Sequence, residues 1–250
     1  MQPSISFSVR KIMTIMIVAV VFLHIMSLAV TIHAQQTAPE TLLEGQEHGL
    51  LRMFDVSTEA NLPTWYSDIT LGFSSVLLLV IGLVKKGEHD RFAWSWLFMS
   101  IVFCFLSMDE ASSIHEGVGS FMSTHVKNSG VATYGWMIPW GIFTLGFALV
   151  YTRFLLALPR KTAVLMVIAG AIYVGGALSG GVGGEFGTKV LEGVLGQKFG
   201  SLSLMDVVMH DVGEWGEMGG VLLFNYTLLT YLKDHIGPVI VSLGRTPQTK

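Results

Sequence analysis

The sequence predicts an all-α, multi-pass integral membrane protein. Hydrophobic residues make up 51% of the 250 residues and charged residues only 13%, against about 25% charged residues in a typical soluble domain. The apolar residues form long runs with basic residues near their ends, as helices that cross a bilayer do. We therefore expect one transmembrane domain over residues 1–250, surrounded by membrane lipid. The net charge of −3 offers no basic surface for a nucleic acid, which excludes that class of partner.

Six apolar runs are long enough to cross a hydrocarbon core of about 30 Å at about 1.5 Å of rise per helical residue. They cover approximately residues 12–32, 66–84, 92–109, 133–155, 162–182 and 203–232. The first run has a second interpretation, a cleaved secretory signal, because Ile32-His33-Ala34 resembles a cleavage site. Its length favours a retained span, since the apolar part of a signal is usually about 7–15 residues long.

Residues 35–64 differ from these runs because acidic residues are frequent in them. Their apolar residues recur at helical spacing, which predicts an amphipathic helix lying on the outer face of the membrane. These residues are Leu43, Leu50, Leu51 and Phe54. Asn61-Leu62-Pro63 ends this interfacial segment, and Trp65-Tyr66 then begin the second span where an aromatic belt is expected.

The distribution of basic residues predicts the orientation of the six spans. One side of the membrane would hold Arg10, Lys11, Lys85, Lys86, Arg91, Arg153, Arg160, Lys161 and Lys233. The other side would hold only Arg52, Lys127, Lys189 and Lys198. Basic residues in short loops are enriched on the cytoplasmic side, so we expect both termini in the cytoplasm and the protein in the plasma (inner) membrane.

The sixth run begins with an unusually polar stretch, residues 206–217. At about 100° per helical residue, its ionisable groups share one side of a helix within about 80°. These groups are Asp206, His210, Glu214 and Glu217. Each charge would cost about 2.5–3.5 kcal/mol at the centre of a spanning helix unless it faces protein, water or a metal. Gly213, Gly216 and Gly220 lie along the edge of this stripe, where a neighbouring helix could approach closely.

A second polar stretch closes the third run and contains Asp109, Glu110, His115 and Glu116. On a continuous helix Asp109 and Glu116 share a face, and Glu110 and His115 lie about 100° to either side of it. The third and sixth runs cross in opposite directions, so both polar stretches are expected near the outer leaflet. Glu185, at the outer end of the fifth run, is expected at the same depth.

Seven carboxylates and two histidines at one depth need a counter-charge, because neither the third nor the sixth run contains Lys or Arg. A divalent metal ion would supply it, and a mixture of imidazole and carboxylate donors suits Zn, Mn or Fe. The candidate ligands are Asp109, His115, Glu116, His210, Glu214 and Glu217. His24 on the first run could add a third imidazole, although a lone His in an apolar run more often serves packing. Cys104 is the only cysteine, which excludes a thiolate cluster.

These patterns favour a His and carboxylate site that binds a divalent metal in an outward-facing cavity. As an enzyme, the protein would use Glu110 or Glu217 as general base on a lipid or a small periplasmic substrate. One alternative is a proton- or cation-coupled transporter that uses the same carboxylates. Another is an accessory subunit of a larger membrane complex or a homo-oligomer, with haem bound by His115 or His210. The polar groups could also form only a hydrogen-bonded seam between helices.

Overall fold

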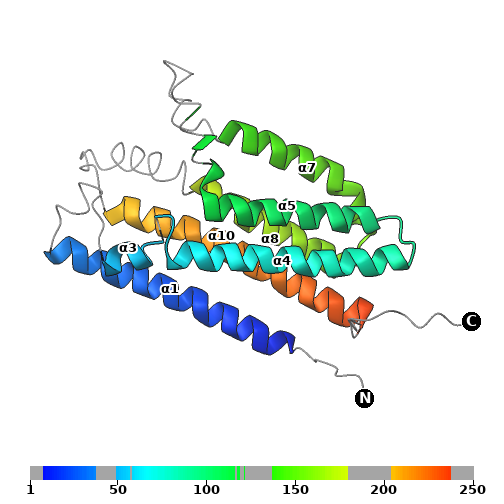
Figure 1. Cartoon of the computed structure of the whole chain (residues 1–250), viewed down its shortest axis with the longest axis horizontal. Coiled ribbons are helices and arrows are strands. Elements are labelled where there is room, and N and C mark those ends of the chain that lie inside the picture. Colours follow the sequence, from blue (N-terminus) through cyan, green and yellow to red (C-terminus); the bar gives the residue numbers. More distant parts are fainter. Residues whose placement is uncertain are drawn as a thin grey trace, which may run out of the picture.

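The chain folds into a bundle of helices. The computed structural model describes residues 8–37, 49–56, 58–115, 117–118, 121, 137–179 and 204–237, with the side chains of all these except 35, 137–138 and 204–210. The described helices are α1 (Val9–Thr37), α3 (Leu50–Phe54), α4 (Leu62–Gly87), α5 (Ala93–Ser112), α7 (Met137–Ala157), α8 (Arg160–Leu178), α10 (Leu204–Tyr231) and the π-helical turn η3 (Leu232–Ile236). The six long helices begin and end within five residues of the six apolar runs in the sequence. The part of the chain described contains no strand, and Figure 1 shows the long helices side by side.

The length and apolar composition of several helices fit a membrane-spanning bundle. Among the described residues, five stretches are long and apolar enough to cross one. They are Val9–Ala34, Leu62–Gly87, Ala93–Ser112, Pro139–Ala157 and Arg160–Leu178. α10 has a comparable length, but its first half carries the acidic residues. The outward face of α7 is strongly apolar and exposed, with Val150 at 76% and Leu156 at 81% exposure, as a surface in contact with lipid is. The chain is therefore a helical membrane protein; its membrane and the sides of its termini stay predictions.

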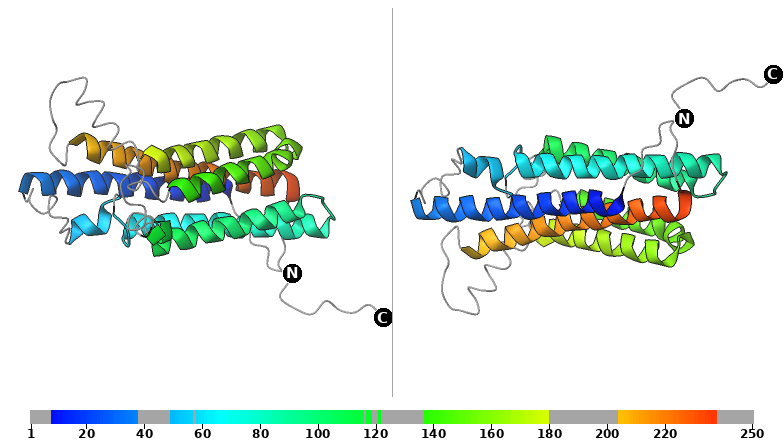
Figure 2. Two further views of the ribbon diagram at one scale, coloured as in Figure 1. Left: turned by 90° about the horizontal axis from the view of Figure 1, so that it is seen from above. Right: turned by 90° about the horizontal axis from the view of Figure 1, so that it is seen from below.

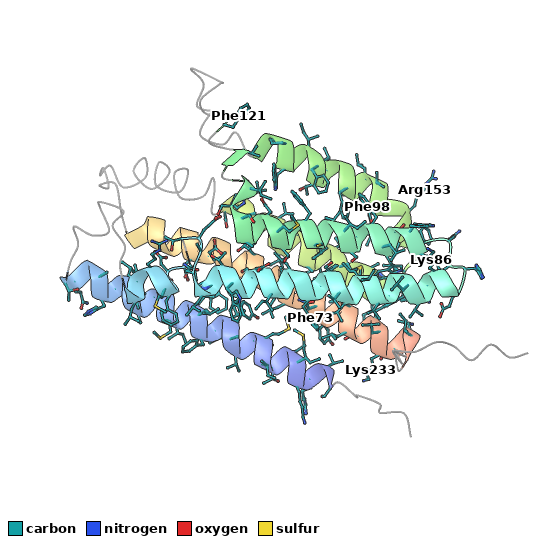
Figure 3. The ribbon with its side chains drawn as sticks, viewed as in Figure 1. Phe73, Lys86, Phe98, Phe121, Arg153 and Lys233 are labelled. Atoms are coloured by element: carbon teal, nitrogen blue, oxygen red, sulfur yellow. The ribbon has the colours of Figure 1, made fainter. Side chains whose placement is uncertain are left out.

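The two ends of the bundle differ in charge. Figure 3 shows Lys86, Arg153 and Lys233 together at the end where α4, α7 and α10 finish. We call this the basic end and the opposite end, where α3 lies, the α3 end. Lys85 and Lys86 occupy the last turn of α4, where cations interact favourably with the helix dipole.

α4 begins with a well-defined cap at the α3 end. The Asn61 side chain accepts a hydrogen bond from the Thr64 backbone N–H at 3.1 Å, and Pro63 lies in the first turn. The Asn61-Leu62-Pro63 boundary expected from the sequence therefore marks the start of this helix. The interfacial segment before it contains only one short described helix, α3, while residues 38–48 and 57 lie outside the described residues.

α8 and α10 pack so closely that their backbones touch. A Cβ added at Gly176 would lie 2.6 Å from the Gly213 carbonyl oxygen, and one at Gly216 would lie 2.8 Å from the Gly176 Cα. These distances leave no room for a side chain on either helix. The glycine edge of the polar stripe on α10 is thus the contact with α8. Gly180 and Gly184, which continue the spacing of Gly176, lie outside the described residues.

A buried polar group joins α4 to α10 in the middle of the bundle. Asn225 is fully buried, accepts a hydrogen bond from the Ser74 hydroxyl at 2.9 Å and donates one to the Thr70 carbonyl at 3.1 Å. Toward the basic end, an apolar core surrounds Trp96 and Phe154, whose rings meet edge to face with centroids 4.9 Å apart. These hydrogen bonds fix the register of α4 against α10 between the acidic residues and the basic end.

α1 is displaced toward the α3 end, as Figures 1 and 2 show. Tyr66, in the first turns of α4, donates a hydrogen bond to the Met16 carbonyl of α1 at 2.9 Å. Beyond this contact, only about 10 Å of α1 continues toward the basic end, against about 30 Å of α4. The start of α1, which carries Arg10 and Lys11, therefore points toward the basic end but stops short of it. The side of the membrane on which these two residues lie stays a prediction.

Candidate functional site

His115 lies between two carboxylates at the α3 end. Its Nδ1 is 3.3 Å from Asp109 Oδ2 and its Nε2 is 3.4 Å from Glu59 Oε1. Its backbone N–H also donates to Asp109 Oδ1 at 2.8 Å. The described side chains thus link the end of α5 to the loop that precedes α4.

This contact corrects the sequence interpretation, which placed His115 about 100° away from Asp109 on a continuous helix. α5 ends at Ser112, because Ser113 adopts a left-handed conformation with φ 50°. Because the helix ends there, Asp109 can accept from the backbone N–H of His115 and also face its ring. Non-glycine residues rarely adopt this conformation, and no glycine or proline in the sequence marks the break.

The two carboxylates favour the charged form of His115. The hydrogen bond that the ring donates to Asp109 and the negative charges of Asp109, Glu59 and Glu110 raise the pKa of His115 from 6.5 to about 9, although partial burial lowers it. The imidazole is therefore positively charged at neutral pH. It is one positive charge beside several acidic groups.

Three glutamates from α5 and α10 interact electrostatically with one another, and we call them the glutamate cluster: Glu110, Glu214 and Glu217. Glu217 interacts electrostatically with Glu110 and with His115. Glu214 interacts with Glu217, Glu110 and Glu59. The structure therefore brings the acidic residues of these two helices together, and neither helix contains Lys or Arg.

Other residues singled out in the sequence lie outside this description. Glu116 and Glu185 are outside the described residues, and the side chains of Asp206 and His210 are not described although their backbone belongs to α10. Among the side chains that the structure does describe, no three from His, Cys, Asp or Glu converge closely enough to hold a metal ion. The structure thus gives the expected metal centre no support from these residues.

Besides Glu59, two further residues belong to the site and were not found from the sequence. Asp68 of α4 accepts a hydrogen bond from the Ser107 hydroxyl of α5 and interacts electrostatically with Glu110. An acid within an otherwise apolar run was a sufficient signal for it. Tyr173 of α8 interacts electrostatically with the glutamate cluster and with Asp109. Because its side chain is uncharged, no comparable feature of the sequence indicated that Tyr173 belongs to the site.

His24 forms a second histidine and aspartate pair, on the α1 side of α10. Its Nδ1 lies 3.2 Å from Asp211 Oδ1, and its ring stacks on Trp215 with centroids 4.0 Å apart. The side chain is 2% exposed, and its Nε2 has no hydrogen-bond partner among the described residues. The pair places His24 one turn from Glu214 along α10, a depth that the sequence could not assign. It also ties α1 to the helix that carries the acidic stripe.

Comparisons with known proteins give one match. A family model described as a domain of unknown function (DUF8692) matches residues 13–232, which is most of the chain. The matched range begins in α1 and ends in η3, so it includes every residue of the site described above. No curated protein and no solved structure matches the chain.

Proposed function

The chain belongs to the family described as a domain of unknown function (DUF8692), and we propose that it binds a cation in the glutamate cluster between α5 and α10. The observation that carries this proposal is the meeting of Glu110, Glu214 and Glu217 on two helices without Lys or Arg. Like charges held close together in a poorly solvated place repel strongly. A bound cation would offset that repulsion.

A divalent metal ion, Zn, Fe or Mn, is the first candidate for this cation. Carboxylate oxygens of the glutamate cluster and of Asp109 would be its oxygen donors, and His115 would give a nitrogen after losing its proton. Glu116 and His210 remain candidate ligands from the sequence. With a metal bound, Glu110 or Glu217 would serve as general base on a metal-bound water, and a lipid or small periplasmic molecule would be the substrate.

Metal analysis of the purified full-length protein tests this candidate. We expect about one or two metal ions per chain, and strongly reduced binding when Glu214 and Glu217 are both changed to Gln. Asp234→Asn is a matched control, because Asp234 is an exposed acid in η3 at the basic end. A stoichiometry near zero in the unaltered protein, after growth and purification without chelators, would reject metal binding.

Protons are the second candidate, because protonation would also remove the repulsion among Glu110, Glu214 and Glu217. The glutamates would then be neutral and exchange protons, as in a proton-coupled transporter. Infrared spectroscopy separates the two candidates, because a protonated carboxylic acid has a carbonyl stretch that a metal-bound carboxylate lacks. We expect the carboxylic acid band in metal-free protein and a weaker band in Glu214→Gln. If Mn²⁺ binds, adding it should replace this band with that of a carboxylate. A band that Mn²⁺ leaves unchanged would favour proton exchange.

A further inference from the structure

A small cavity lies between the start of α8 and the end of α10, at the basic end of the bundle. Its volume is about 40 Å³, which is room for about three water molecules or for the oxygens of one phosphate group. Residues from the first two turns of α8, the last turns of α10 and η3 line it. It lies roughly 15–20 Å along α10 from Glu217, so it is separate from the glutamate cluster.

The α8 side of the cavity presents hydrogen-bond donors. Pro159 precedes the first turn and provides no side-chain cap, so the first backbone N–H groups of this 19-residue helix lack one. Thr162 lines the cavity and is only 7% exposed, yet its hydroxyl makes no hydrogen bond within the described part of the chain. A buried hydroxyl of this kind usually meets water or a ligand. Lys161 lines the same cavity and adds a positive charge, so the donors suit an anion.

The surroundings of the cavity are also basic. Figure 3 shows Lys86, Arg153 and Lys233 at this end of the bundle, and Arg160 begins α8 there. Asp234 is the one acid among the described residues that line the cavity, and it is exposed, where water and salt screen its charge. The distribution of basic residues predicts that this end faces the cytoplasm, where the membrane surface carries anionic phospholipids.

An apolar stripe leads from the cavity along α8. Four residues at helical spacing share one face within about 60°: Lys161, Leu165, Ile168 and Ile172. Leu165 lines the cavity, and Ile168 and Ile172 are 43% and 40% exposed. From Lys161 to Ile172 the stripe is about 16 Å long, close to half the thickness of a hydrocarbon core. The acyl chains of a phospholipid would cover this stripe, whereas a free phosphate ion would not.

We propose that this cavity binds the phosphate group of an anionic phospholipid, whose acyl chains lie along the apolar stripe of α8. The Lys161 ammonium group compensates the phosphate charge, and the Thr162 hydroxyl and the uncapped N–H groups donate hydrogen bonds to its oxygens. A zwitterionic lipid gains less here, because its own ammonium group is repelled by the basic residues of this end. The proposal does not depend on the cation proposed for the glutamate cluster.

Native mass spectrometry of the full-length protein in detergent compares phosphatidylglycerol with phosphatidylcholine of the same acyl chains. We expect phosphatidylglycerol to bind more tightly, and Lys161→Gln to weaken its binding about fivefold, the contribution of one basic residue near an anionic membrane surface. Thr162→Val, which removes the hydroxyl and keeps the shape, should also weaken it. Lys86→Gln is the matched control, because Lys86 is an exposed lysine of the same end that does not line the cavity, and its effect should be much smaller.

Each contrary outcome overturns a defined part of the proposal. Equal effects of Lys161→Gln and Lys86→Gln would show attraction by the overall charge of this end instead of a site. Equal binding of the two lipids would reject an anionic lipid, and displacement of phosphatidylglycerol by excess inorganic phosphate would assign the cavity to free phosphate.

A photoreactive phosphatidylglycerol gives a second readout that needs no variant. In the unaltered protein its label should lie on peptides from the start of α8 and the end of α10. Label confined to other helices would place the lipid elsewhere and overturn the assignment. None of these results bears on the glutamate cluster, which the metal analysis described above tests separately.

Discussion

The contact between Asp109 and His115 makes a prediction about stability and pH. In Asp109→Asn the side-chain oxygen can still accept from the His115 backbone N–H, but the negative charge beside the ring is gone. The largest cause of the raised pKa of His115 is therefore removed. We expect this pKa to fall from about 9 toward its ordinary value of 6.5.

The size of the effect follows from the two pKa values. A shift from 6.5 to about 9 is worth at most about 3.5 kcal/mol at about 1.4 kcal/mol per pKa unit. The His115 side chain is 26% exposed, so solvent screening reduces this to roughly 1–2 kcal/mol. Because the folded-state pKa is the higher one, this stability is fully present below pH 6.5 and is lost as the pH rises through about 9.

Equilibrium unfolding in mixed detergent, with chelator present, measures this difference. The unaltered protein should lose roughly 1–2 kcal/mol between pH 6.5 and 9.5, and Asp109→Asn should lose much less. Asp234→Asn, at the other end of the bundle, should behave like the unaltered protein. If Asp109→Asn keeps the full pH dependence, the pairing of Asp109 with the His115 ring is not what holds the proton.

Three further predictions concern the packing around the site. Gly216→Ala should destabilise the protein by about 1–3 kcal/mol because its Cβ meets the α8 backbone; Gly219→Ala, where a Cβ meets nothing within 4 Å, should be nearly neutral in the same unfolding assay. Asn225→Ala should cost about 1–3 kcal/mol by leaving buried polar groups unpaired, and equal stability would show that water replaces the amide. His24→Phe should loosen α1 from α10 because it removes the partner of Asp211, whereas His24→Asn keeps a donor near the position of Nδ1. Disulfide formation between cysteines introduced on the two helices measures this, and equal cross-linking in both variants would contradict it.

The sequence was sufficient to predict the long helices and one of their contacts. The apolar runs are long, and a bilayer requires a minimum helix length, so the approximate bounds of the long described helices could be predicted from them. Gly216 and Gly220 marked the side of α10 on which α8 packs, because only small residues allow backbones to touch. These features depend on local composition, which can be read directly from the sequence.

The details of the site could not be predicted in the same way. The left-handed conformation of Ser113, which lets Asp109 meet His115, occurs at a position where the sequence has no glycine to indicate it. The register of α1 is equally hidden, because an apolar helix can slide past another with little change in its pattern of burial. Tyr173 joins the site through the packing of α8 on α10 rather than through any charge of its own.

The stagger of α1 has a consequence for the surrounding lipid. Ile25, Leu28 and Ile32 are 59%, 45% and 40% exposed on the part of α1 nearest the α3 end. A bilayer centred on α4 and α5 would leave these side chains above its hydrocarbon. Tilting of α1 or local thickening of the lipid would cover them, at a cost of fractions of a kcal/mol per Å. We therefore expect the position of α1 to respond to acyl-chain length, and the contact between His24 and Asp211 connects α1 to the helix that carries Glu214 and Glu217.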